Sequence, residues 1–307
     1  MSTIEKVRAA QSSLVERNIS RETRDGILFA LPYLALFSVF LLYPLFKGLY
    51  MSFLDWNSFQ PSQSTFIWFE NYIRMFQDPM FWSSLRATVV FVVLTVPTLV
   101  VLGLALALGV NRQIKGKRLL RLIYFSPYVL TVSIVSLIWR ELYSPDYGPL
   151  NHYLGFFLQD PPTWLNSFTW AMPAVALATI WWTVGFNFVI LLAARQGVSP
   201  RLYEAARIDG ASSLRAFKDI TLPQMRPAIV FVTIVQFITS FQVFGQVFIM
   251  TEGGPGNSTQ SLVMYLYRIA FAEGQFGYAS AIGYFLFLVL VVISIINFKV
   301  AGDSTNE

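Results

Sequence analysis

Six long apolar segments constrain this chain more than any other feature of its sequence. They lie at about 27–46, 87–110, 122–139, 170–193, 228–250 and 281–298. An α-helix needs roughly 20 mainly apolar residues to cross the hydrocarbon core of a bilayer. Lipid offers no hydrogen-bond partner to the backbone, so each of these segments must be helical. The sequence therefore predicts an all-α polytopic membrane protein with six transmembrane helices.

Composition supports a membrane protein over a soluble one with a large helical core. Hydrophobic residues make up 55% of the chain and charged residues only 13%, against about 25% charged in typical soluble domains. Prolines interrupt several of the segments, Pro127 among them, and membrane helices tolerate this when neighbours satisfy the freed carbonyl groups. There is no cysteine and a single histidine. We therefore expect no disulfide, no metal site and no Ser-His catalytic pair.

The distribution of Lys and Arg predicts which side of the membrane each connection faces. Most of the 22 basic residues lie in the N-terminal segment 1–26, in the connection 112–121 and in the connection 194–227. Cytoplasmic loops carry the excess of positive charge. We expect a cytoplasmic N-terminal segment, a membrane domain over 27–300 and a cytoplasmic tail over 301–307. This topology accounts for the net charge of +5, so no nucleic-acid partner is expected; lipid surrounds the membrane domain.

Several classes of membrane protein are disfavoured by what the segments lack. No acidic residue lies near the centre of a segment, whereas ion-coupled transporters usually carry ionisable groups or unwound helices at membrane depth. We see no internal repeat, which suggests half of a pathway completed by a second subunit. A membrane-embedded enzyme would need a catalytic constellation, and none is visible, so we expect no catalytic residue. The nucleotide-binding Gly-x-x-x-x-Gly-Lys-Ser/Thr loop is also absent.

The long connection between the fourth and fifth segments predicts a helix, a sharp bend and a second helix. The Ser-Pro pair at 199–200 is a typical N-cap and first turn. Gly210 is placed to end that helix in a left-handed conformation. One of the serines at 212–213 can cap a second helix running through Leu222, where Pro223 should disrupt it.

A small apolar face is expected on the first of these two helices. Leu202, Ala205 and Ala206 share one face at helical spacing. The small alanine side chains would let a partner backbone approach closely, which suits a docking contact. An amphipathic connector lying on the membrane surface fits the same pattern, and the residues alone leave both interpretations open.

The same connection carries a longer motif that resembles a known signature. Its residues are Glu204, Ala205, Ala206, Gly210, Ile220, Leu222 and Pro223. In type and spacing they match the EAA signature of permeases of binding-protein-dependent ABC importers. The resemblance implies a type I ABC importer permease (MetI-like) fold, in which this loop couples the membrane helices to a separate ATPase. It implies that Glu204 contacts the ATPase and that Gly210 provides the bend.

Further expectations follow from this resemblance. ATP and Mg would be bound by a dimer of ATPase subunits, and this chain would carry no cofactor of its own. The outer stretches 69–89 and 251–282 look like those of the carbohydrate-uptake type, known from maltose, glycerol-phosphate and oligosaccharide importers. That type implies a second homologous permease, an extracytoplasmic solute-binding protein and a location in the bacterial inner membrane. The extra spans and large outer domain of the maltose permease are absent.

Polar and aromatic residues inside the fourth and fifth segments mark a candidate solute path. They are Trp181, Trp182 and Asn187 in the fourth segment, and Ser240, Gln242, Phe244 and Gln246 in the fifth. Amide groups are costly in hydrocarbon, so they should face protein or water. Helix-to-helix hydrogen bonding is the alternative role. No basic residue lies deep in either segment, which favours a neutral solute such as a sugar; a polyol, glycerol phosphate or an amino acid remain alternatives.

Overall fold

Residues 23–57, 60–111 and 116–302 are described by the computed structural model of the chain, and most of them are helical. The first 22 residues and residues 303–307 of the expected tail lie outside this description. Two very short strands, β1 (Leu54–Asp55) and β2 (Thr65–Phe66), pair in antiparallel fashion, with Leu54 opposite Phe66. The shorter helices are η2 (Pro61–Gln63), α3 (Glu70–Gln77), α7 (Pro149–Leu154), η4 (Trp164–Asn166), α13 (Leu262–Tyr267) and η6 (Arg268–Ala272).

Five helices in the described part of the chain are long and apolar enough to cross a membrane, and a bent pair makes up to six. They are Thr23–Met51, which contains η1 (Ser38–Leu42) and α2 (Tyr43–Met51), α4 (Pro79–Asn111), α8 (Ala171–Gly197), Ser213–Phe241, and α14 (Phe276–Gly302). Each coincides with all or much of one apolar segment in the sequence. The expected all-α membrane architecture is confirmed.

The third apolar segment is not the continuous helix that the sequence predicted over 122–139. Its elements are α5 (Lys117–Phe125), η3 (Ser126–Val129) and α6 (Val132–Leu142), and the two halves are bent by 99°. Pro127 lies in the first turn of η3 and cannot donate a backbone hydrogen bond. Leu130 and Thr131 are extended, and the Thr131 side chain accepts from the amide of Ile134 to begin α6. The chain therefore turns within the membrane domain.

The fifth segment is also interrupted where the sequence predicted one helix over 228–250. Its helix ends at Phe241, and a separate helix α12 (Gly245–Met250) follows. At the break, the Val243 carbonyl accepts a hydrogen bond of 2.6 Å from the hydroxyl of Ser261. A carbonyl that leaves the helical ladder needs such a partner. The break is thus stabilised by a residue that lies beyond the segment in sequence.

Pro223 does not end a helix, contrary to the sequence expectation. The helix begins after Ser212, whose hydroxyl accepts from the amide of Arg215, and continues to Phe241. Its turn before the proline is widened, because the amide of Leu222 bonds the carbonyl of Phe217 five residues earlier. A wide turn accommodates the proline ring, which would otherwise clash with the preceding turn. The components are α10 (Ser213–Ala216), η5 (Phe217–Thr221) and α11 (Leu222–Phe241).

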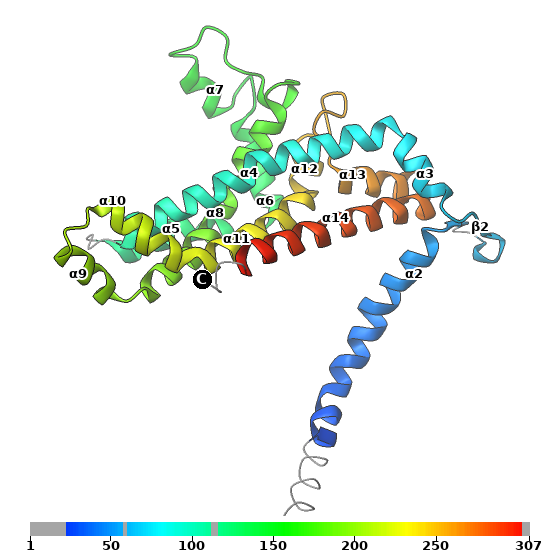
Figure 1. Cartoon of the computed structure of the whole chain (residues 1–307). Helices are drawn as coiled ribbons and strands as arrows, with labels where there is room; N and C mark the ends of the chain where they lie inside the picture. The colour runs from blue at the N-terminus through cyan, green and yellow to red at the C-terminus, as the bar shows by residue number, and fades with distance from the viewer. Residues whose placement is uncertain (1–22, 58–59, 112–115, 303–307) are drawn as a thin grey trace, which may run out of the picture.

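The core forms where α4 packs along α8, and the first helix stands apart from it. A Cβ on Gly103 would lie only 2.8 Å from the Cβ of Asn187, so the two helices approach closely because glycine has no side chain. In contrast, the most apolar stretch of the helix Thr23–Met51 contains no buried residue. That helix projects away from the remaining bundle (Figure 1). The core of the described chain is therefore built from the later helices.

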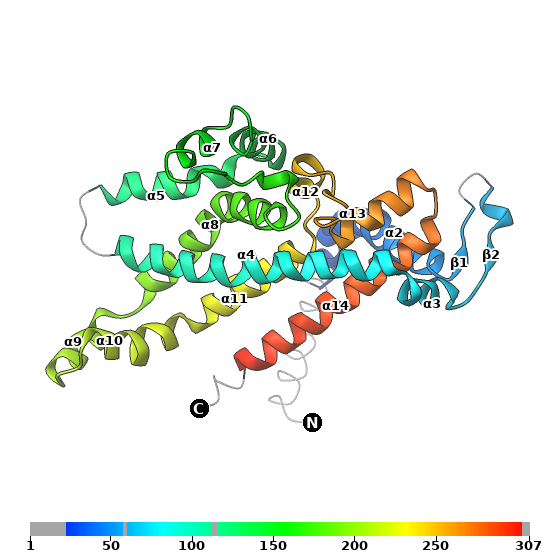
Figure 2. The same cartoon turned by 90° about the horizontal axis from the view of Figure 1, so that it is seen from above.

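The two ends of the bundle carry different connections. Figure 2 shows α9 (Pro200–Ile208) and α10 at one end, with the C-terminal ends of α4 and α14. The opposite end carries β1, β2, α3 and α13. Successive spans thus run in alternating directions.

Candidate functional site

The connection between α8 and α11 forms the expected helix and bend. The helix α9 follows Ser199, which occupies the N-cap position without making a side-chain capping bond. Gly210 has a φ of +74°, a left-handed conformation that favours glycine. The amide of Ala211 bonds the carbonyl of Ala206 at 2.8 Å, which closes the end of the helix. The bend predicted at Gly210 is present.

Apolar side chains are exposed around this bend. Ile208 is 87% exposed and Leu214 is 76% exposed, on either side of Gly210. Leu202 and Ala205 are also exposed, as a docking face would require, whereas Ala206 is half-buried. Ile208 and Leu214 were missed by sequence reasoning. The available signal was that apolar residues flank a left-handed glycine within a strongly charged connection.

The remaining motif residues join the loop to the membrane helices. Tyr203 on α9 makes a hydrogen bond of 2.8 Å with the hydroxyl of Thr221 in η5. Ile220 packs against the buried cluster that includes Met225. Leu222 is half-buried and Pro223 exposed. The motif is therefore divided between an exposed tip, with Glu204 and Ala205 on it, and a packed stem that leads into α11.

A second candidate site is a cavity of about 610 Å³ where the breaks in the third and fifth segments lie beside α8. Its walls come from α8, α11 and α12 and from the broken third segment. Five of the predicted solute-path residues line it: Trp182, Ser240, Gln242, Phe244 and Gln246. The cavity lies beside the breaks in the third and fifth segments, which is where straight helices would leave no room.

The polar groups of this cavity are uncharged and partly free. None of its lining residues is acidic or basic. Gln242 is exposed and Gln246 half-buried, and neither side chain makes a hydrogen bond within the described part of the chain. Trp182 donates from its indole nitrogen to the Leu130 carbonyl at 3.0 Å, which fixes its ring in the wall. Amide groups and a fixed aromatic ring suit a hydroxyl-rich, neutral ligand.

Two predicted residues lie outside the cavity lining, and a third is only partly available. Asn187 is fully buried, and its side-chain oxygen accepts a hydrogen bond of 2.9 Å from the side-chain amide of Gln236. The Trp181 ring packs against Trp139 at 5.8 Å between centroids. Ser240 lines the cavity, but its hydroxyl also lies 3.0 Å from that of Thr95. Hydrogen bonding between helices therefore explains why Asn187 lies in an apolar segment, and it partly explains Ser240.

Other lining residues were missed by sequence reasoning. Phe91 comes from α4, and Tyr128 and Val132 come from the bend in the third segment. Tyr128 and Val132 could have been identified from Pro127, because a proline in an apolar segment indicates a break in the helix there. Gly245 packs so tightly here that a Cβ would lie 2.9 Å from a methyl carbon of Val132. The two breaks are thus in direct contact beside the cavity.

On the opposite end from α9, Asp78 ties together three helices. Its carboxylate accepts from the Met80 amide at 2.8 Å, at the start of α4, and from the hydroxyls of Tyr265 and Tyr278. Burial raises the pKa of Asp78, but the hydrogen bonds from both tyrosines and from the backbone outweigh it. The pKa of Asp78 is therefore below its ordinary value.

Comparisons with known proteins show which family the chain resembles. The model of a family described as binding-protein-dependent transport system inner membrane component matches residues 81–300. The chain is 38% identical to the diacetylchitobiose uptake system permease protein NgcF of Streptomyces coelicolor, over 91% of this chain and 83% of that protein. It is 35% identical to the sulfoquinovosyl glycerol transport system permease protein SmoG of Agrobacterium fabrum, over 90% and 89%.

A solved structure is similar over nearly the whole chain. It is a chain of a bacterial ABC transporter involved in the import of the acidic polysaccharide alginate, with a TM-score of 0.79 and 25% sequence identity. The similarity covers 94% of this chain and 99% of that chain. A second structure of the alginate transporter, in complex with an alginate pentasaccharide-bound periplasmic protein, has a TM-score of 0.77.

Proposed function

The chain belongs to the family of binding-protein-dependent transport system inner membrane components, and on that premise we propose that it forms half of the membrane pathway for a neutral sugar. As a member of this family it is a permease subunit of an ABC importer, a transport component rather than an enzyme. The observation that carries the proposal is the uncharged cavity of about 610 Å³ at the breaks of two spans.

The chemistry of the cavity favours a neutral saccharide over an anionic solute. Gln242 and Gln246 present free amides to it, and Trp182 presents a ring, the groups that bind hydroxyls and sugar faces. An alginate or a glycerol phosphate would need basic side chains to offset its charge, and this lining has none. Relatives named for diacetylchitobiose and for trehalose/maltose support a sugar. A polyol would satisfy the same groups and is the alternative.

A second permease is supported by the first helix. The most apolar stretch of Thr23–Met51 has no buried residue, and its large side chains are exposed, with Phe29 at 87% and Phe40 at 75%. Side chains this apolar need lipid or a partner helix. We propose that one face packs on a homologous permease, so that two chains enclose one path, and that the remaining face contacts lipid.

The exposed tip around Gly210 is proposed as the ATPase contact. Glu204 and Ala205 lie on it beside Ile208, and Tyr203 and Ile220 attach it to the stem of α11. A force applied to the tip would therefore move α11, whose far end lines the cavity. In this proposal ATP and Mg are bound by the ATPase dimer, both termini are cytoplasmic, and an extracytoplasmic binding protein delivers the solute to the opposite end.

The test uses the complex reconstituted in lipid with its ATPase, its second permease and its binding protein. ATP hydrolysis is measured with binding protein loaded in turn with neutral oligosaccharides, alginate fragments or glycerol phosphate. We expect stimulation by a neutral sugar alone. Stimulation confined to an anionic solute would refute the solute class.

Two matched substitutions test the coupling loop in the same assay. Gly210 and Gly116 both have positive φ, of +74° and +84°, and both lie in open space. An alanine at either position carries a similar backbone strain of about 1 kcal/mol. We expect Gly210→Ala to reduce the stimulation by the binding protein and Gly116→Ala to leave it intact. Equal effects of the two would contradict the coupling role.

A further inference from the structure

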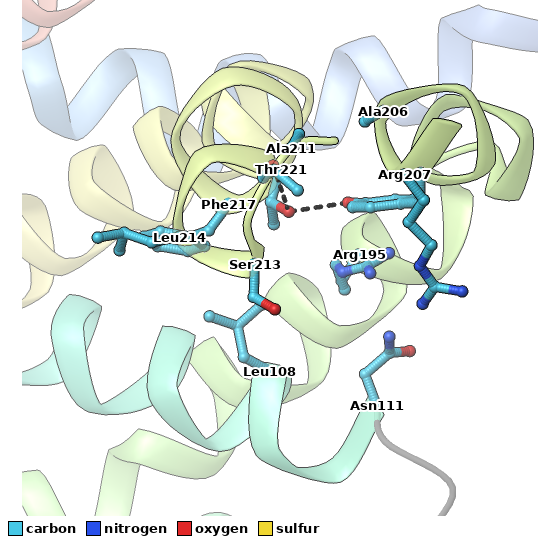
Figure 3. Close-up of a pocket in the computed structure, with 12 residues that line it drawn as sticks. Leu108, Asn111, Arg195, Ala206, Arg207, Ala211, Ser213, Leu214, Phe217 and Thr221 are labelled. Atoms are coloured by element: carbon cyan, nitrogen blue, oxygen red, sulfur yellow. Dashed lines mark hydrogen bonds between the residues drawn. The ribbon is translucent and has the colours of Figure 1, made fainter. Parts of the chain in front are cut away.

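A second cavity, of about 480 Å³, lies between the coupling loop and the ends of the membrane helices. Its walls come from the end of α4, the end of α8, and the facing sides of α9, α10 and η5. Figure 3 shows the side chains of Arg195, Arg207 and Asn111 pointing toward a common space. Ile208 is exposed and is not part of this lining, whereas Glu204 borders a neighbouring hollow.

The cavity has an unbalanced positive charge. Its lining includes two guanidinium groups and no carboxylate. Within the part of the chain that the structure describes, neither Arg195 nor Arg207 forms an ion pair, although both also border a neighbouring hollow that includes Glu204. Asn111 and Ser213 add hydrogen-bond donors to the wall. A partly enclosed site with two unpaired guanidiniums attracts an anion.

One of the two arginines is held in place before any ligand binds. The Arg195 guanidinium lies over the ring of Tyr203, 4.5 Å from its centroid. The Tyr203 hydroxyl is in turn fixed by its 2.8 Å hydrogen bond to Thr221. An arginine stacked on an anchored ring loses less freedom on binding a ligand than a free surface arginine does.

We propose that this cavity binds a phosphate group, from the head group of an anionic lipid or from a soluble phosphorylated metabolite. Arginine forks match the geometry of phosphate oxygens. The two sources share the same chemistry, and basic pockets at the cytoplasmic ends of membrane helices suit lipid head groups. This site borders the exposed tip assigned to the ATPase, because Leu214 lies beside both, but its existence does not depend on that assignment.

A bound phosphate would tie the coupling loop to the membrane helices. Arg207 belongs to α9, whereas Arg195 lies in the last turn of α8 and Asn111 ends α4. A ligand that contacts all three bridges the part that receives force and the part that moves. We therefore expect occupancy of the cavity to change how strongly ATP hydrolysis responds to the loaded binding protein.

Binding is measured on the whole complex with two probes. Phosphatidylglycerol is titrated into the complex and counted by native mass spectrometry, with phosphatidylcholine as the neutral-headgroup reference. Glucose 6-phosphate is titrated by calorimetry into the complex in phosphatidylcholine bilayers. For the probe that binds, Arg207→Gln should weaken affinity about tenfold or more, as expected for loss of a charge-assisted pair. Which probe responds identifies the source.

Arg215→Gln is the matched control, because Arg215 lies in the same loop outside the cavity and pairs with Asp219 at 3.4 Å. It removes the same charge and should leave the affinity unchanged. Arg195→Lys is a milder second variant that keeps the charge, loses the fork and should weaken binding several-fold. Any phosphate bound by the ATPase subunits contributes equally to wild type and to every variant, because the ATPase subunits are unchanged. The proposal is overturned if neither probe distinguishes wild type from Arg207→Gln, or if Arg215→Gln weakens binding equally.

Discussion

The contact between α4 and α8 at Gly103 gives the sharpest prediction about packing. Replacing Gly103 with alanine would bring its Cβ within 2.8 Å of the Cβ of Asn187, with the backbone of residues 187 and 188 at 3.4 Å. Carbon atoms pack at about 3.5–4.0 Å. The helices would therefore have to separate by roughly 1 Å at this point. Asn187 is also held by Gln236 on α11, so a third helix resists that movement.

The effect of Gly103→Ala on the free energy of unfolding has a destabilising and a stabilising part, and a second variant separates them. Overpacking of this kind costs about 1–3 kcal/mol, while replacing glycine in a helix by alanine gains up to about 1 kcal/mol. Gly109 lies in the same helix with nothing within 4 Å of an added Cβ. Gly109→Ala therefore carries the gain without the cost, and the difference between the two variants isolates the overpacking, at about 1–3 kcal/mol.

Thermal unfolding of the assembled complex measures this difference. At roughly 2–4 °C per kcal/mol, the unfolding midpoint of Gly103→Ala should fall several degrees below that of Gly109→Ala. Transport should fall with it, because α8 forms a wall of the cavity. If both variants unfold at the same temperature, the close approach of α4 and α8 is wrong.

Three further predictions concern stability and assembly. Ile208→Ser should reduce co-purification of the ATPase without lowering the unfolding midpoint of the permease, because Ile208 is 87% exposed; retained co-purification would contradict the contact. Asp78→Asn should destabilise the complex at neutral pH: the pKa of Asp78 is lowered, so its stabilisation is complete above about pH 4 and is lost as pH falls further. If the difference in stability between Asp78→Asn and wild type stays the same as the pH is lowered below about 4, this prediction is wrong. For Asn187→Leu and Gln236→Leu, a double-mutant cycle should give a coupling of about 0.6–1.7 kcal/mol, and zero would exclude their hydrogen bond.

Local chemistry made much of the fold predictable from sequence. The apolar segments have the length that a bilayer requires, and the turn at Gly210 follows from the properties of that residue. The structure has the left-handed φ of +74° there. A helix over 200–208 likewise follows from Pro200 in its first turn. In these cases the deciding interaction lies within a few residues along the chain, so the sequence alone contains it.

Features that depend on distant partners were not predictable. The break in the third segment is stabilised by Trp182, which donates to Leu130 from 52 residues away. The break in the fifth depends on Ser261, 18 residues beyond Val243. Periodicity could not find either partner, so both segments were predicted as single helices.

The distinction between solute path and helix bonding has the same origin. Asn187 and Gln242 both carry side-chain amides in apolar segments, and the sequence favours Gln242 for solute contact without giving Asn187 its partner. The structure buries Asn187 against Gln236, whereas Gln242 lines the cavity without a side-chain partner in the described chain. Only the packing of three helices separates the two roles.

Photocrosslinking of the transported sugar tests the central claim most directly. A photoreactive derivative is delivered by the binding protein to the complex, which is trapped before hydrolysis, and the modified peptides are mapped. The account predicts adducts at residues 179–186 of α8 and 239–246 around the break, with Gln242→Ala reducing their yield. Adducts confined to other helices, or unchanged by Gln242→Ala, would contradict the assignment of this cavity as the solute path.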